Sequence, residues 1–84
     1  MRIFFTHRFL KMANSLSIAL QKELQEKVEM FQIPANHQSL KLHKLKGHLD
    51  GFFSFSVNYK TRVICEKVSE GFVLHAVGDH DVYQ

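Results

Sequence analysis

The spacing of apolar residues changes halfway along this 84-residue chain, and the change limits the folds open to it. In the first half, apolar residues recur at every third or fourth position, at Leu16, Leu20, Leu24, Val28 and Phe31. This spacing predicts a helix with one buried stripe. Further on, the sequence FFSFSV at residues 52–57 alternates aromatic residues with serine, as is typical of a strand with one buried face. The chain must therefore combine helices with a sheet.

The N-terminal segment predicts a strand followed by a short helix. Residues 2–5 are expected to form the strand, and Thr6 is suited to cap a helix through residues 7–13. Asn14 and Ser15 then interrupt the helical pattern. The apolar run of three residues before Thr6 is too short for a signal peptide or a membrane span, so we expect a cytoplasmic protein.

The rest of the chain predicts one helix and then a sheet. The helix is expected from about residue 16 to residue 31, and Pro34 with Asn36 ends the helical region. Three strands are expected to follow, at residues 53–57, 62–68 and 72–77. The order β-α-α-β-β-β predicts an α+β fold, a small antiparallel sheet with the two N-terminal helices packed on one face. A chain of this length is expected to form a single domain, residues 1–84.

The face of the sheet without helices is the expected place for function. If the aromatic residues of the first of these three strands pack toward the helices, Ser54 and Ser56 face the open side, together with Arg62. A one-residue bulge would reverse this assignment. Cys65, the only cysteine, lies in an apolar pattern and is expected to be a buried hydrophobe, which suits a reducing cytosol.

Basic residues are concentrated between residues 41 and 62. This segment holds five basic residues against one acidic residue, while the whole chain has a formal charge of +3. Such a cluster indicates either an anionic partner, nucleic acid or an acidic protein segment, or a solvated basic surface.

Three short motifs follow one another in the second half of the chain. They are HKLKG at residues 43–47, YKTRVIC at 59–65 and GDHDVY at 78–83. Together with the N-terminal strand and helical hairpin, their order and spacing resemble the RelE/ParE superfamily of bacterial type II toxins. HKLKG is similar to an element of the YafQ-like branch, and GDHDVY is similar to an ending shared by several branches. The RelE/YafQ-like branch is therefore favoured.

The resemblance implies a toxin that is neutralised by a cognate antitoxin. Active RelE-like and YafQ-like members are endoribonucleases that cleave messenger RNA in the ribosomal A site and so inhibit translation. The substrate's own 2′-hydroxyl attacks the neighbouring phosphate, so the reaction is metal-independent and no cofactor is implied. The implied partners are the antitoxin, in a hetero-oligomer, and the ribosome with its mRNA, without a membrane. A ParE-like inhibitor of DNA gyrase and a catalytically reduced, antitoxin-binding relative are the alternatives.

The same resemblance implies four catalytic residues, His80, Arg62, His43 and Tyr83. His80 can exchange protons near neutral pH, and Arg62 offers a fork of donors to phosphate oxygens. Tyr83 would orient or stack on a nucleotide, and His43 would assist proton transfer. Structural roles are the alternatives. They are an exposed loop histidine or a cap of the strand end for His80, loop packing for His43, an ion pair with Glu66 for Arg62, and cover of the core for Tyr83.

RNA contacts are implied for five further residues, Lys41, Lys44, Lys46, Ser54 and Ser56. The lysines are expected to bind phosphates as point charges, in a contact that salt weakens. The two serines stand where RelE-like members carry basic residues and YafQ-like members a histidine. Because serine is a weak acid and a weak base, catalysis must rest on fewer groups, or activity is reduced.

The remaining histidines are given no part in catalysis. His75 lies in an apolar strand and is expected to be a satisfied sheet histidine, while His7, His37 and His48 have no persuasive partner. A metal site is not expected, because His43 and His48 lack a recognisable ligand spacing.

Overall fold

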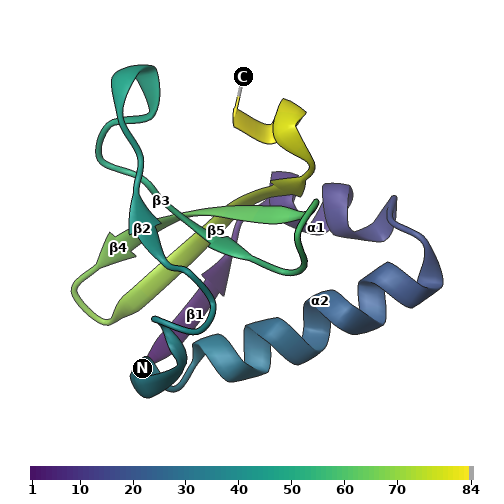
Figure 1. The fold of residues 1–84 in the computed structure, drawn as a ribbon, viewed down its shortest axis with the longest axis horizontal. Coiled ribbons are helices and arrows are strands. Elements are labelled where there is room, and N and C mark those ends of the chain that lie inside the picture. The colour runs from purple at the N-terminus through teal and green to yellow at the C-terminus, as the bar shows by residue number, and fades with distance from the viewer. Residues whose placement is uncertain (84) are drawn as a thin grey trace.

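The computed structural model describes residues 1–83, with the side chain of His80 outside that description. It is an α+β fold with one five-stranded sheet in the order β1-β5-β4-β3-β2 (Figure 1). The helices and strands are β1 (Arg2–Phe5), α1 (His7–Asn14), α2 (Ile18–Phe31), β2 (His43–Lys44), β3 (Phe53–Ser56), β4 (Arg62–Val68) and β5 (Gly71–Gly78). Short 3-10 turns, η1 to η3, lie at Pro34–Asn36, Gly47–Leu49 and His80–Tyr83.

Antiparallel hairpins join β3, β4 and β5, as the sequence predicts. β1 returns to pair in parallel with β5, so it closes one edge of the sheet. The other edge is β2, which pairs antiparallel with β3. The sequence predicts no strand where β2 lies, because two residues are too few to show an alternating pattern.

Both helices begin at side-chain caps. The Thr6 hydroxyl accepts a hydrogen bond from the backbone N–H of Phe9, at 3.0 Å, as predicted. α2 begins at Ile18, later than predicted, because Ser17 is its cap and accepts from Leu20 N at 3.2 Å. Leu16 still packs against the core from the preceding turn. At the other end, α2 stops at Phe31, and η1 is a separate turn.

α2 lies across one face of the sheet, and α1 packs beside β5 (Figure 1). The main core lies between α2 and the sheet, and its fully buried members include Phe31, Phe55, Val63, Cys65 and Leu74. Burial raises the pKa of the Cys65 thiol to about 12, so this cysteine is a neutral core residue. Neither helix of the described chain is long and apolar enough to cross a membrane.

The opposite face, here called the open face, carries a smaller apolar cluster. Ile64 and Ala76 lie on it side by side and are covered by Val82 of η3. Ser54 pairs with Ile64 and Ser56 with Arg62, so the face predicted for both serines and Arg62 is confirmed. In Figure 1, η3 and the loop that carries η2 lie on this side of the sheet, away from α2.

One irregularity interrupts the pairing of β4 with β5. Ile64 pairs with Ala76, whereas the next residue, Cys65, pairs with Leu74. His75 is therefore an extra residue on β5, which is the arrangement of a β-bulge. The bulge lies past Ala76, so it leaves Arg62 on the open face.

Gly71 allows β1 to approach β5, and its substitution tests the parallel pairing. A Cβ atom at Gly71 would lie 1.8 Å from the backbone oxygen of Arg2. We expect Gly71→Ala to lower the free energy of unfolding by about 2 kcal/mol or more, measured by chemical denaturation. Gly78→Ala is the matched control, since the nearest atom to its Cβ would be Val82 Cβ at 3.6 Å. Equal stability of the two variants would contradict the pairing.

Candidate functional site

The C-terminal turn η3 folds back over the open face. Val82 is only 8% exposed and packs on Ile64 and Ala76. This contact fixes the backbone of the turn, to which His80 belongs, just beyond the end of β5. The side chain of His80 lies outside the described part of the structure, so its part in catalysis stays a prediction.

Two polar contacts hold Tyr83 at the end of this turn. Its hydroxyl lies 2.9 Å from the hydroxyl of Ser54, and either group can be the donor. Its backbone carbonyl accepts a hydrogen bond from Nε2 of His48, also at 2.9 Å. His48 thus has a partner that its sequence surroundings do not reveal, because the partner lies 35 residues away. These contacts join η3 to the loop of η2.

Ser54 is fully buried, whereas Ser56 is half-buried. The Ser54 hydroxyl is already engaged by Tyr83, so RNA could contact it only if the turn moved. Ser54 therefore orients an aromatic side chain in this fold. No signal in the local sequence predicts that contact.

Arg62 begins β4, opposite Ser56 on one side and Gly78 on the other. Its Nη1 group donates to the backbone carbonyls of Asn58 and, at 3.2 Å, Thr61. The ion pair between Arg62 and Glu66, considered from the sequence, does not form among the described residues, because Glu66 contacts His75. Nε and Nη2 of Arg62 make no hydrogen bond with the described residues, so they are available to an anion.

The other basic candidates follow the edge of the sheet. His43 lies on β2 opposite Ser54, is exposed, and donates from Nδ1 to the carbonyl of Lys41 at 2.9 Å. Lys41, Lys44 and Lys46 are all exposed around this strand. The structure therefore places a row of exposed cationic groups along the β2 edge. Lys44 pairs with Phe53, which packs against the main core, so Lys44 lies on the helical side of that edge.

These positions together define a candidate site for an anionic polymer. Arg62 and the turn of Tyr83 lie on the open face, and the exposed lysines follow the β2 edge of the sheet. His75 also lies on the open face and contacts Glu66, and the sequence predicts no catalytic role for this histidine. Within the described residues, no group of three or more histidine, cysteine or acidic side chains is arranged to hold a metal ion.

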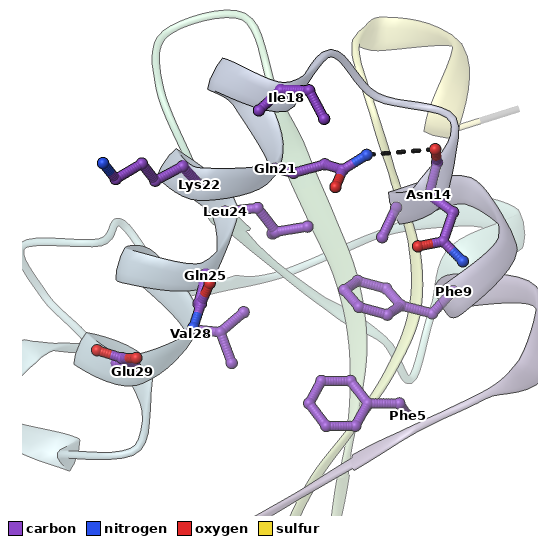
Figure 2. A pocket seen from close by; sticks show the side chains of 11 residues that line it. Phe5, Phe9, Asn14, Ile18, Gln21, Lys22, Leu24, Gln25, Val28 and Glu29 are labelled. Atoms are coloured by element: carbon purple, nitrogen blue, oxygen red, sulfur yellow. Dashed lines mark hydrogen bonds between the residues drawn. The ribbon is translucent and has the colours of Figure 1, made fainter.

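A groove on the helical side of the molecule is separate from this site. It measures about 460 Å³ and lies between β1, α1 and α2. In Figure 2, Phe5 and Phe9 face Leu24 and Val28 across it. Phe5 is 46% exposed and Ile18 is 79% exposed, so the groove presents apolar surface to solvent.

No protein-family model matches the chain, and no curated protein matches it in sequence. Solved structures match it in fold. A conserved hypothetical protein from Helicobacter pylori has a TM-score of 0.74 at 14% identity, with 100% of this chain and 99% of that chain covered. A YoeB–YefM complex from Staphylococcus aureus has a TM-score of 0.73 at 17% identity, with 95% of this chain and 97% of that chain covered. A RelB–RelE antitoxin–toxin complex from Methanococcus jannaschii has a TM-score of 0.69 at 19% identity, with 93% of this chain and 91% of that chain covered.

These likenesses extend over nearly the whole chain, although identity is low. The chain has the α+β fold of the RelE and YoeB structures, and at the level of fold the resemblance drawn from the sequence is confirmed.

The contact between Ser54 and Tyr83 can be measured by a double-mutant cycle. We expect Ser54→Ala and Tyr83→Phe to show a coupling of about 1 kcal/mol in unfolding free energy, the usual net value of one hydrogen bond. Ser56→Ala paired with Tyr83→Phe should be additive, since Ser56 lies two residues along the same strand without this bond. Additivity in the Ser54 cycle would show that the turn is held by other contacts.

Proposed function

We propose that this protein is the toxin of a type II toxin–antitoxin pair and acts as a metal-independent endoribonuclease on messenger RNA at the ribosome. One observation carries the proposal: the fold of RelE and YoeB recurs here with Arg62 and the turn of His80 and Tyr83 gathered on the open face. We infer from this fold, from the placement of these residues and from the sequence motifs that the protein is a type II toxin, that it cleaves mRNA and that the ribosome is its partner.

The chemistry needs few groups from the protein. Attack by a ribose 2′-hydroxyl on the next phosphate requires a base for the hydroxyl, donors for the developing negative charge, and an acid for the leaving 5′-oxygen. Arg62 can supply the donors through Nε and Nη2, and His80 can supply the proton for the leaving oxygen. Tyr83, positioned by Ser54, can orient a nucleotide.

The cationic row along β2 suits a supporting role in RNA binding. Lys44 and Lys46 are exposed, and lysine contacts to phosphate position a chain without reading its sequence. His43 lies among them and can assist proton transfer from the edge of the open face. Since Ser54 and Ser56 carry no charge, RNA affinity must depend on these neighbours.

Two alternatives share the same fold. A ParE-like gyrase inhibitor would need no catalytic histidine, and a catalytically reduced relative would keep only antitoxin binding. The two serines on the open face favour reduced catalysis, because they remove two cationic positions from β3. Direct measurement of protein and DNA synthesis separates the three possibilities.

The groove between α1 and α2 is the proposed binding site for a segment of the antitoxin. Exposed apolar side chains line it, and an amphipathic segment that folds on binding can bury them. Acidic residues of the same antitoxin would cover Lys44, Lys46 and Arg62. In this arrangement, one partner occupies the groove and neutralises the open face.

The first functional prediction concerns the order of cellular effects. Induced expression should stop growth, and incorporation of labelled amino acids should fall before incorporation of labelled thymidine. The reason is that mRNA cleavage stops translation directly. His80→Ala and Arg62→Ala should restore growth, with cleavage slowed about a hundredfold if each group acts in the transition state. Unchanged protein synthesis with an early DNA-damage response would instead support the gyrase alternative.

The second functional prediction concerns the antitoxin. Ile18→Glu should weaken binding of the protein encoded by the adjacent gene by about tenfold or more, because it places a charge in the apolar groove. Ile33→Glu is the matched control, since Ile33 is also exposed, at 57%, but does not line the groove. Titration calorimetry measures both. Equal affinities for the two variants would place the antitoxin elsewhere.

A further inference from the structure

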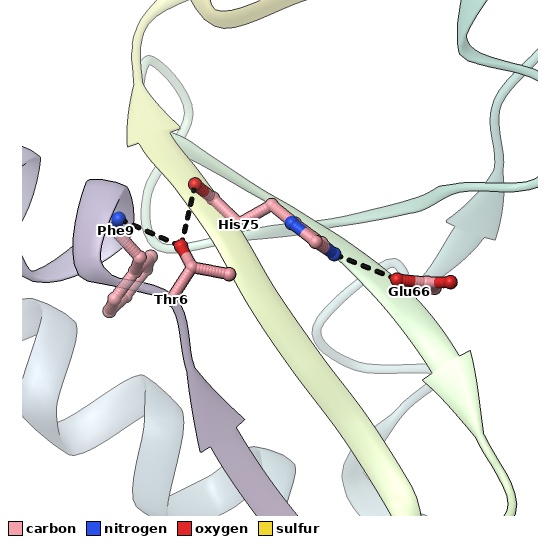
Figure 3. A network of polar contacts seen from close by, with 4 residues as sticks. All are labelled: Thr6, Phe9, Glu66 and His75. Carbon is pink, nitrogen blue, oxygen red and sulfur yellow. Dashed lines mark hydrogen bonds and ion pairs between the residues drawn. The ribbon is translucent and has the colours of Figure 1, made fainter.

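The open face carries a histidine paired with a carboxylate. Nε2 of His75 lies 2.9 Å from Oε1 of Glu66 on the neighbouring strand (Figure 3). The side chains are 30% and 46% exposed, so both still reach solvent while they make this contact. Alternation along β4 places Glu66 on the same face as Arg62 and Ile64.

The β-bulge brings His75 to this position. His75 is the extra residue of β5, and it lies on the open face next to Ala76. Its carbonyl accepts a hydrogen bond from the Thr6 hydroxyl at 3.4 Å, while the Thr6 N–H donates to the carbonyl of Leu74 at 3.1 Å. The cap of α1 therefore also holds the bulged backbone, as Figure 3 shows for Thr6 and Phe9.

The His75 ring is held on a second side by an aromatic residue. Phe52, just before β3, meets it edge to face, with 5.4 Å between ring centroids and 88° between planes. Glu66 is the one charged group that contacts the ring among the described residues. Other charged groups lie on the neighbouring α1 and in the segment before Phe52, namely Arg8, Lys11, Lys44, Lys46 and Asp50. None of these described groups makes a hydrogen bond or an ion pair with the His75 ring.

This arrangement selects one tautomer of the neutral imidazole. A carboxylate accepts hydrogen bonds, so Nε2 carries the proton in the contact with Glu66. Nδ1 then carries the lone pair, and it makes no hydrogen bond with the described residues. A histidine whose ring is oriented by a carboxylate is the arrangement that proteins use for a general base.

We propose that His75 is the general base of the RNA cleavage proposed above and that Glu66 is its positioning residue; the proposal rests on that function. The proton of the ribose 2′-hydroxyl passes to Nδ1 of His75. The 2′-oxygen bonds to phosphorus while the bond to the 5′-oxygen breaks, and the leaving oxygen takes a proton from the C-terminal turn, where His80 is the proposed acid. The products are a 2′,3′-cyclic phosphate and a 5′-hydroxyl, so no oxidant or metal is needed.

The placement of the two groups suits that division of roles. His75 lies three residues before Gly78 on β5, about 10 Å along the strand, and the turn of His80 follows Gly78 on the same face. A ribose and its 3′-phosphate bound between them would have an acceptor on one side and a donor on the other. Such a pair predicts a bell-shaped dependence of rate on pH.

The test is single-turnover cleavage of ribosome-bound mRNA by the full-length protein across pH 5 to 9. His75→Ala should lower the rate about a hundredfold and remove the rise of the rate with pH on the acid side. Glu66→Ala should lower the rate about tenfold, and nitrogen-15 NMR of its His75 ring should show loss of the preference for the Nε2-protonated tautomer. His7→Ala and Glu70→Ala are matched controls, since both residues are exposed and lie outside the open-face pair.

Two results would overturn the inference while leaving the proposed function intact. One is wild-type rate and pH profile in a folded, ribosome-binding His75→Ala variant. The other is a wild-type His75 ring protonated at Nδ1, which would leave that nitrogen without a lone pair. Absence of cleavage by the wild-type protein itself would overturn the proposed function, and with it the role of His75.

Discussion

Phe31 at the end of α2 is the contact on which the rest of this structure depends. Its ring is fully buried and stacks on Phe55 of β3, with 4.2 Å between centroids, and it meets Phe72 of β5 edge to face at 4.9 Å. His37 stacks on its outer side at 4.5 Å and contacts the carbonyl of Phe31 through Nε2. One side chain thus ties a helix to two strands that are not adjacent.

The consequence of that packing is a sheet with two unlike faces. Large side chains fill the face toward α2, while the open face carries Ile64 and Ala76 between polar residues. The chain covers this small apolar centre with Val82 rather than with a helix. Burial of Val82 stabilises η3 and brings Tyr83 over Ser54. It also fixes the backbone of the turn to which His80, the proposed acid, belongs. Stability and the proposed chemistry therefore share one short segment.

Thr6 joins the two halves of the molecule in a similar way. Its hydroxyl caps α1 through Phe9 N and also donates to the carbonyl of His75. A bulge leaves backbone groups outside the regular pairing, and a buried carbonyl without a partner would be costly. The N-terminal cap supplies that partner, so the position of His75 depends on a residue 69 positions earlier in the chain.

The sequence by itself determined the two helices, the three hairpin strands and the α+β fold, and it indicated the face of Arg62, because apolar spacing and caps act over a few residues. Only the tertiary structure decided the parallel place of β1, the short strand at His43, the burial of Ser54 against Tyr83 and the pairing of His75 with Glu66. Each of these joins residues far apart in the chain or on different strands. The pairing register of the strands and a one-residue bulge determine which of these residues meet, and neither leaves a local pattern in the sequence.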